Sequence, residues 1–376
     1  MVKLDCLITN INFRENLRSK SLNKTINTKV ADIKTILPDI KLPVVNSHQA
    51  IVYFTGAKKI TLENLAEQID RKKLEQHVKY LASDELAGRL PDTEGSEKAQ
   101  EYIISNFKES GLRPFKPFAD KTYKQHAIFE VFYHARVQNP KTKKLEHDNS
   151  KDALNVEGSI YRVTNILGYI PAKTKTDKYV FLTAHYDHLG RDHDSGKVFT
   201  GADDNASGVA AMLEIARVLG KRKYDKNIVF VATSGEETKC LGSKYLAQQL
   251  NINGFKDKVE IINMDCLAAK GKYLTIEGGK PQKNIKLEKA AIDAAKRLKV
   301  PYSNEDHERN YHTDAAAFDK EGGFPAISLV WAYEDDFGNR LYNHKTTDTA
   351  AKANYDGIEK STKVALGTVF SLATES

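Results

Sequence analysis

Apolar runs typical of buried strands alternate with segments of helical periodicity in the second half of the chain. The predicted strands are residues 180–184, 228–232, 259–264 and 326–331. The predicted helices are residues 209–219, 242–250, 285–298 and 355–372. This alternation is typical of a largely parallel or mixed sheet with helices on both faces. The pattern therefore predicts an α/β fold, in which ligands bind at the carboxyl ends of the strands.

The first half of the chain has a different pattern. Residues 1–60 are polar, lysine-rich and weakly patterned, and we expect an N-terminal extension whose role the sequence does not indicate. Apolar residues at helical spacing follow Thr61, which can serve as an N-cap, and continue to Leu81. Strand-like alternation follows later, in residues 123–137 and 159–170. We therefore expect one domain that spans residues 61–376.

Composition narrows the class of protein. The chain has 376 residues, of which 40% are hydrophobic and 28% are charged, as in ordinary soluble globular proteins. The net charge of +7 is small, and no dense basic block is interleaved with aromatic residues, so nucleic-acid binding is not expected. No apolar run is long enough to span a bilayer, and residues 1–13 lack the pattern of an export signal, so neither a membrane span nor an export signal is expected from the sequence as given. The three cysteines form no Cys-x-x-Cys pair, which argues against a disulfide framework or a thiolate zinc site.

A glycine-flanked acidic turn directly precedes the predicted helix at residues 209–219. Residues 201–208 read Gly-Ala-Asp-Asp-Asn-Ala-Ser-Gly, and Asn205 or Ser207 can cap the first turn of that helix. Taken alone, the turn is explained by such capping. A cap does not need two additional carboxylates, so the turn also offers spare anionic ligands.

Acids and histidines follow three of the predicted strands. His185 and Asp187 come after the first strand, Glu236 and Glu237 after the second, and Asp265 after the third. The carboxyl ends of parallel strands meet at one edge of a sheet, so we expect these side chains to lie together. Imidazole and carboxylate ligands without thiolate are typical of catalytic zinc, which keeps an open position for water. The sequence therefore predicts a zinc site at this edge.

Two pairs of neighbouring residues indicate separate roles within that site. His185 and Asp187 point to the same side of an extended segment, so the carboxylate can accept the second N–H of the imidazole and orient it. The alternative for this pair is a surface contact. In Glu236–Glu237 one carboxylate can bind metal while the other acts as general base and then general acid. The alternative is a solvated pair at a helix N-terminus, but adjacent buried carboxylates are costly without a cation.

These motifs resemble the signatures of the M28 family of co-catalytic zinc aminopeptidases. The resemblance begins at about Leu65, includes a helix boundary at Leu-Ala-Ser-Asp-Glu-Leu-Ala-Gly-Arg (residues 81–89), and continues in the family's order to the C-terminus. It implies a three-layer α/β/α sandwich with a mixed, largely parallel central sheet, of the zinc-exopeptidase type. The motifs that carry it are residues 183–190 (Thr-Ala-His-Tyr-Asp-His-Leu-Gly), 201–208, 234–237 (Ser-Gly-Glu-Glu), 263–265 (Asn-Met-Asp) and His344.

Carried over position by position, the resemblance implies two zinc ions and their ligands. Asp203 is expected to bind both ions, with a cis peptide bond directly after it. His185 and Asp265 would complete one site, and Glu237 and His344 would complete the other.

The resemblance also implies the catalytic residues. Glu236 is expected to be the general base and Asp187 the carboxylate that orients the first histidine ligand. Family members supply a further donor to the developing oxyanion, and the matching region offers Tyr311 or His312. This region departs from the family's usual Ser-Asp-His, and a capped helix start at Thr313 explains it equally well.

The function implied is a zinc-dependent aminopeptidase. A catalytic domain at residues 61–376 would hydrolyse the first peptide bond of peptides with a free N-terminus, through a hydroxide that two zinc ions activate. The alternatives on the same fold are a carboxypeptidase or dipeptidase, which could use Arg309 or Arg340 for the C-terminal carboxylate, and a single-zinc glutaminyl cyclase. A further alternative is a non-catalytic, receptor-like binding module. The family is mostly exported, and the compartment of this chain stays open.

Overall fold

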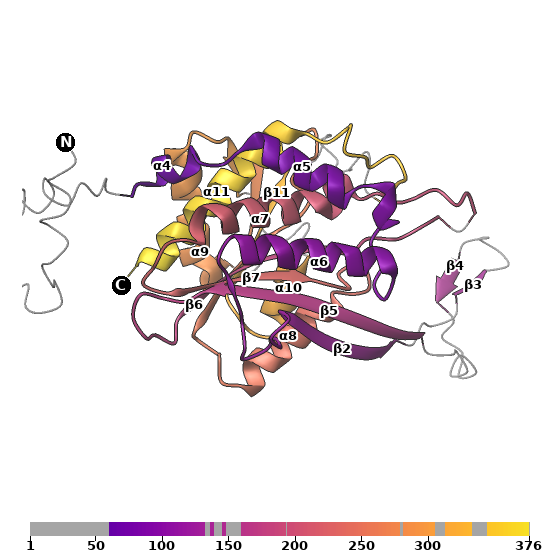
Figure 1. Cartoon of the computed structure of the whole chain (residues 1–376), viewed down its shortest axis with the longest axis horizontal. Helices are drawn as coiled ribbons and strands as arrows, with labels where there is room; N and C mark the ends of the chain where they lie inside the picture. Colours follow the sequence, from indigo (N-terminus) through magenta and orange to yellow (C-terminus); the bar gives the residue numbers. More distant parts are fainter. Residues whose placement is uncertain are drawn as a thin grey trace, which may run out of the picture. The chain divides into compact units, whose positions relative to one another are not determined.

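The fold is built around a nine-stranded mixed sheet (Figure 1). The computed structural model describes residues 60–131, 136–138, 145–147, 159–192, 194–278, 281–304, 313–332 and 344–375. Residues Thr61–Ser376 belong to one compact unit. The roles assigned to the extension and to the domain stay predictions. Tyr311, His312, Arg309 and Arg340 lie outside the described residues.

The sheet has a parallel centre and antiparallel flanks. Its strand order is β1-β5-β7-β6-β8-β11-β9-β10, and β2 also pairs with β5. Strands β7, β6, β8 and β11 are parallel to one another, whereas β5 and β9 run antiparallel to their neighbours β7 and β11. The strands are β1 (Arg113–Pro114), β2 (Lys124–Val131), β5 (Ser159–Ile170), β6 (Tyr179–His185), β7 (Asn227–Thr233), β8 (Val259–Met264), β9 (Leu274–Glu277), β10 (Tyr302–Ser303) and β11 (Ala326–Trp331), with β3 (Arg136–Gln138) and β4 (Leu145–His147) in a separate pair.

Helices cover both faces of this sheet. One face packs against α6, α7, α9 and α11, with α5 on the outside of α7 and α11, and the other face packs against α8 and α10. None of the described helices is long and apolar enough to cross a membrane. The helices are α4 (Leu62–Ala66), α5 (Arg71–Leu81), α6 (Glu94–Glu109), α7 (Ser207–Leu219), α8 (Leu241–Ile252), α9 (Pro281–Arg297), α10 (Asp314–Lys320) and α11 (Tyr355–Thr374), with short turns η1 (Asp84–Leu86) and η3 (Ala202–Ala206).

The mainly apolar sequences of the central strands follow from this covering on both faces. In β6, Val180 and Leu182 point into the core beneath α7 and α11, and Phe181 points into the core beneath α8 and α10. All three side chains are fully buried. Each such side chain contributes about 1.5–3 kcal/mol when it leaves water. The expected three-layer α/β/α fold with a largely parallel centre is confirmed.

The predicted elements agree with the structure except at short segments. Strands β8 and β11 have the predicted bounds, and Thr61 caps α4 through its side chain. The helix expected from Thr61 to Leu81 is wrong as one element, because the chain breaks after α4 and Asp70 caps a new helix by accepting the N–H of Lys72. Strands β1, β9 and β10 were not predicted, since two to four residues carry too little periodicity.

Candidate metal centre

The side chains predicted from the strand ends meet at one edge of the sheet. His185 is the last residue of β6, Asp265 follows β8, and Glu236 and Glu237 follow β7. Strand β6 lies between β7 and β8 and is parallel to both. After β6 the chain forms β7 on one side of it and then β8 on the other side. Ligands of open α/β sheets bind at the strand ends where the strand order reverses in this way.

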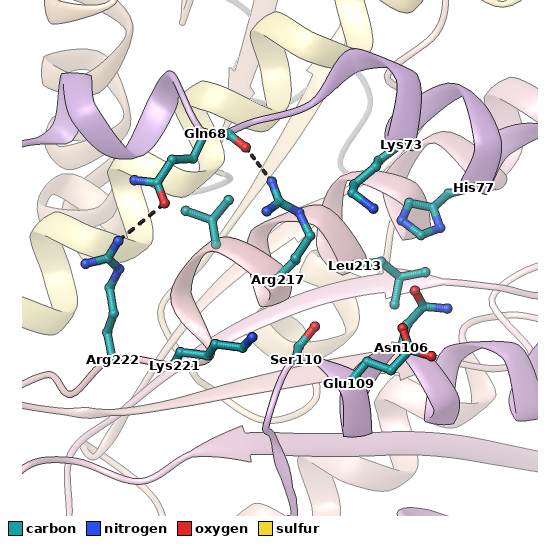
Figure 2. Close-up of a pocket in the computed structure, with 11 residues that line it drawn as sticks. Gln68, Lys73, His77, Asn106, Glu109, Ser110, Leu213, Arg217, Lys221 and Arg222 are labelled. Carbon is teal, nitrogen blue, oxygen red and sulfur yellow. Dashed lines mark hydrogen bonds between the residues drawn. The ribbon is translucent and has the colours of Figure 1, made fainter.

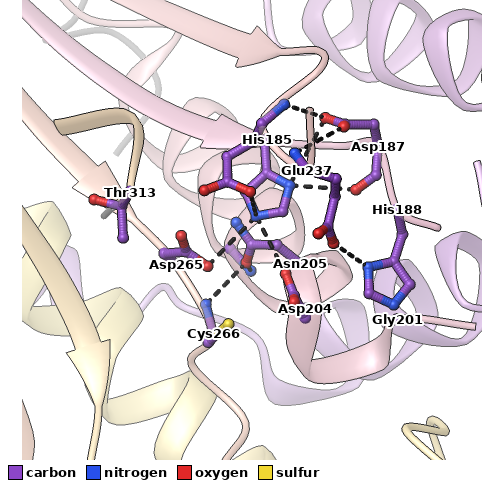
Figure 3. A network of polar contacts seen from close by, with 12 residues as sticks. His185, Asp187, His188, Gly201, Asp204, Asn205, Glu237, Asp265, Cys266 and Thr313 are labelled. Carbon is purple, nitrogen blue, oxygen red and sulfur yellow. Dashed lines mark hydrogen bonds and ion pairs between the residues drawn. The ribbon is translucent and has the colours of Figure 1, made fainter. Parts of the chain in front are cut away.

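One carboxylate, that of Asp204, lies between two groups of potential ligands (Figure 3). Its Oδ1 is 3.2 Å from Nε2 of His185, and its Oδ2 is 3.3 Å from Nε2 of His344. On the first side, Asp265 Oδ1 is 3.5 Å from His185 Nε2. On the second side, Glu237 Oε2 is 3.0 Å from His344 Nε2. The two oxygens of a single side chain thus face two separate groups.

The structure corrects the position expected for Asp203. The Asp203 carboxylate accepts the backbone N–H of Ala268 at 2.6 Å, and neither of the two ligand groups includes it. The cis peptide bond likewise lies between Asp204 and Asn205, one residue later than expected. The reason is the orientation of the turn η3, which directs the side chain of residue 204 toward the strand ends. Two adjacent aspartates in a sequence do not reveal this direction.

One amide side chain and one carboxylate side chain hold the turn η3 in place. Asn205 Oδ1 accepts the N–H of Gly208 in the first turn of α7 at 2.9 Å, although the N-cap residue of this helix is Ala206. The same residue donates its amide to the carbonyl of Met264, the last residue of β8. Asp348 accepts the backbone N–H groups of Asp203 and Asp204 at 2.9–3.1 Å. The turn is therefore attached both to the sheet and to the segment after His344.

Asp348 is a functional candidate that the sequence analysis missed. It is buried, and burial raises the pKa of its carboxyl to about 6. The Thr200 hydroxyl donates to its main-chain carbonyl. The sequence contains only a weak indication of this residue, namely an acid four residues after His344 in His-Lys-Thr-Thr-Asp. Its role is visible only once the contact with the turn is known.

Asp187 makes different contacts from those expected. Nδ1 of His185 is 3.2 Å from the main-chain oxygen of Asp187, whereas the Asp187 carboxylate is 3.8 Å away. That carboxylate instead accepts the backbone N–H groups of Glu236 and Glu237, at 3.3 and 3.4 Å. Burial raises the pKa of Asp187 to about 7. The residue therefore orients the ring through its backbone, and its side chain holds the turn after β7.

His188 is a second residue whose role the sequence analysis did not identify. Its Nδ1 lies 2.5 Å from Glu237 Oε1, and the side chain is fully buried. His344, in contrast, is 52% exposed. Of the two imidazoles that reach the second group, His188 comes from the sheet edge and His344 from a surface segment. His188 thus fixes the Glu237 carboxylate from the inside.

The electrostatics of these groups favour a bound cation. The buried atoms His185 Nε2 and Asp265 Oδ1 face each other without a hydrogen bond among the described residues. Contacts with Asp204 and Glu237 raise the pKa of His344 to about 10. Burial opposes protonation of His185, but Glu236, Asp265 and Asp204 outweigh it and raise its pKa well above the usual range. Nitrogen and carboxylate oxygen donors of this kind fit zinc.

Glu236 stands beside the first group and is not part of it. Its Oε2 is 4.0 Å from His185 Nε2, and the side chain is 15% exposed. Burial raises the pKa of Glu236 well above its usual range. The Cys240 thiol lies 3.8 Å from Oε1 and donates to it, because burial raises the thiol pKa and keeps the proton on sulfur. Glu236 is therefore held in place with one oxygen directed toward the site.

A buried guanidinium joins the segments that carry these groups. Arg89 is 1% exposed, and burial lowers its pKa to about 10, so that it is charged at neutral pH. It donates to the carbonyls of Tyr186 at 2.7 Å, Thr200 at 2.8 Å and Gly201 at 3.0 Å, and also to that of Leu81. Arg89 thereby links the end of α5, the segment after β6 and the segment before η3.

We expect Arg89→Met to lower the free energy of unfolding by about 3–5 kcal/mol, because buried carbonyls lose their donor. Chemical denaturation of the zinc-loaded protein measures this change. The matched control is Arg162→Met, since Arg162 forms an exposed ion pair with Asp92. That control should change stability by less than about 1 kcal/mol. Equal effects of the two substitutions would contradict the role given to Arg89.

Comparison with known proteins agrees with the site. The model of peptidase family M28 matches residues 165–369, which is more than half of the chain. The alkaline phosphatase isozyme conversion protein of Escherichia coli K12 is 29% identical over 270 residues, covering 67% of this chain and 70% of that protein. Aminopeptidase YwaD of Bacillus subtilis 168 is 26% identical over 210 residues, 55% of this chain and 44% of that relative.

Solved structures show the same fold. A zinc aminopeptidase from Bacillus subtilis superposes with a TM-score of 0.62 at 15% identity, covering 82% of this chain and 96% of its own. A glutaminyl cyclase from Porphyromonas gingivalis superposes with a TM-score of 0.61 at 19% identity, covering 81% of this chain and 99% of its own. Identities this low establish the fold alone. Together with the family match over residues 165–369, they lead to one conclusion. The chain belongs to peptidase family M28 and is a metallo-exopeptidase.

Proposed function

We propose that this peptidase is an aminopeptidase that uses two zinc ions. The observation that carries the proposal is the position of Asp204, whose two oxygens face His185 and His344 separately. A carboxylate shared between two ligand groups is the arrangement by which two metal ions are held close together. The family match and the named aminopeptidase relative support the aminopeptidase activity.

The first zinc ion would be held by His185, Asp204 and Asp265, and the second by Asp204, Glu237 and His344. Asp203 has no part in this set. When bound, the zinc ions polarise the peptide carbonyl and make water more acidic. His188 would keep Glu237 oriented through its Nδ1–H.

Glu236 would transfer the proton during hydrolysis of the peptide bond. Its carboxylate accepts a proton from the attacking water and then gives it to the leaving amine. The Cys240 thiol keeps this carboxylate in place, and Asp187 holds the backbone on which it stands. The surplus of buried carboxylates also suits a substrate whose free amine is positively charged. The donor to the oxyanion, Tyr311 or His312, stays a prediction.

The other activities are less well supported. A glutaminyl cyclase of the same fold was expected to use one zinc ion, whereas this chain has two ligand groups around Asp204. A carboxypeptidase or dipeptidase requires a cation for the C-terminal carboxylate, and the candidates Arg309 and Arg340 lie outside the described residues. A binding module that kept only the fold has no need for either group.

Metal analysis combined with two blocked peptides tests the proposal. We expect about two zinc ions per chain and release of the first residue from a C-amidated peptide. An N-acetylated peptide of the same sequence should be resistant, and a chelator should abolish the release. Cleavage of the N-acetylated peptide with resistance of the C-amidated one would identify a carboxypeptidase. Cyclisation of an N-terminal glutamine without peptide hydrolysis would identify a cyclase.

A further inference from the structure

A cavity of about 530 Å³ lies away from the metal centre, among α5, α6 and α7 (Figure 2). The acidic turn η3 precedes the N-terminus of α7, whereas the cavity lies along the C-terminal half of that helix and the residues that follow it. Leu213 and Val218 of α7 form its apolar part. Its volume is in the range of small-molecule sites, about 300–1,000 Å³. Nothing in the peptidase site makes use of this space.

Basic side chains from separate elements line this cavity. Lys73 comes from α5, and Lys221 and Arg222 follow α7. Within the part of the chain that the structure describes, these three side chains form no ion pair. Arg222 Nη2 donates to Gln68 Oε1 at 3.3 Å (Figure 2), so the guanidinium keeps its charge and its other N–H donors. Arg217 also lines the cavity, but Glu214 already neutralises it at 2.6 Å.

The charge of the cavity lining is therefore unbalanced. Glu109 is the single carboxylate among the described residues that line it. Three unpaired cations against this carboxylate leave a surplus of two positive charges. The surplus matches the charge of a phosphoryl group, which is close to −2 at neutral pH.

Several lysines elsewhere on the helices do have a carboxylate partner. Lys79, on the same helix as Lys73, pairs with Glu75 at 3.5 Å, and Lys98 on α6 pairs with Glu94 at 3.1 Å. Lys289 and Lys360 form similar pairs one turn away, with Asp293 and Asp356, at 2.6 Å. The unpaired positive charges of the cavity lining repel each other, and a bound anion would offset this repulsion.

His77 lies in the cavity wall beside these cations. Burial, together with the charges of Lys73 and Arg217, lowers the pKa of His77 to about 4. Its Nδ1 lies 2.7 Å from the Tyr102 hydroxyl. The imidazole is therefore neutral at physiological pH, and it adds no charge to the surplus.

We propose that this cavity binds the phosphoryl group of a small molecule. Lys73 and Lys221 act as point charges from opposite sides, and the Arg222 guanidinium offers paired N–H donors to the phosphoryl oxygens. The hydroxyl of Ser110, which is buried in the lining, provides a neutral donor. The apolar side chains of Leu213 and Val218 leave room for the remainder of a phosphomonoester.

Binding is measured by calorimetry on the full zinc-loaded chain, with inorganic phosphate and ribose 5-phosphate as probes at constant ionic strength. The proton resonance of His77 is followed in parallel, because it responds to an anion in this cavity and not to one at the zinc ions. We expect bound phosphate to raise the pKa of His77. Tighter binding of ribose 5-phosphate than of phosphate would identify a phosphomonoester as the ligand, and the reverse order would identify free phosphate.

The matched variants are K73Q/K221Q and the control K79Q/K98Q, which removes two lysines outside the cavity lining. We expect the first pair to weaken binding by at least about tenfold and to abolish the His77 response. The control pair should retain both, and thermal melts check that all variants are folded. Equal binding by the two double variants, or an unshifted His77 at millimolar phosphate, overturns the proposal.

Discussion

Glu236→Gln is expected to leave the fold and the zinc content nearly intact while it lowers turnover by several orders of magnitude. The loss of a general base alone accounts for about 10²–10⁴ of this. Gln has the size of Glu and can still accept the contact from the Cys240 thiol, but it cannot take a proton from water. Glu236 also lies outside both ligand groups, so its replacement leaves their donors in place. The measurement is kcat on aminoacyl chromogenic substrates, together with zinc analysis of the same sample.

The neighbouring residue provides the matched control. Glu237 contacts His344 and His188 within the second group. Glu237→Gln should therefore lower the zinc content as well as the activity, because a charged ligand is lost. Turnover of the Glu236→Gln variant near the wild-type rate would exclude the proposed base. Equal zinc loss in both variants would mean that Glu236 is itself a ligand.

The second large effect separates two adjacent aspartates. Asp204→Asn should lower the zinc content at both positions and abolish activity, because one carboxylate serves both groups. Asp203→Asn keeps an oxygen that can accept the N–H of Ala268. This variant should retain most of its zinc and a measurable rate. Zinc analysis and kcat of the two variants, prepared side by side, make the comparison.

The two substitutions differ only in position, so they control for each other. Both remove one negative charge from η3, and both residues are buried. A general effect of charge on folding would therefore appear in both variants. Zinc loss in Asp203→Asn with zinc retained in Asp204→Asn would contradict the shared role of Asp204.

The fold by itself does not decide the reaction. A zinc aminopeptidase and a glutaminyl cyclase superpose on this chain with TM-scores of 0.62 and 0.61. A common fold can carry different chemistry, because function depends on particular side chains. In this protein the distinction rests on the ligand groups around Asp204 and on the position of Glu236.

The sequence by itself determined the fold class and most of the residues that meet at the site. Mainly apolar runs of strand length identified β6, β7, β8 and β11, because strands covered on both faces have no polar side to alternate. His185, Glu236, Glu237 and Asp265 were found because each lies at the end of such a strand or within a few residues after it. Parallel strands bring their carboxyl ends to one edge, so position along the chain was sufficient for these four.

Only the tertiary structure decided which aspartate faces both groups and what holds the site in place. Asp203 and Asp204 are chemically identical neighbours. The direction of their side chains depends on how the turn is held, by Asp348 at their backbone N–H groups and by Asn205 at Gly208. Asp348 is 144 residues distant from Asp204 in the chain, and Arg89 is 112 residues distant from Gly201. Contacts at such separations leave no local periodicity or spacing. A sequence therefore reveals which elements form, whereas the orientation of a turn between them depends on the packed structure.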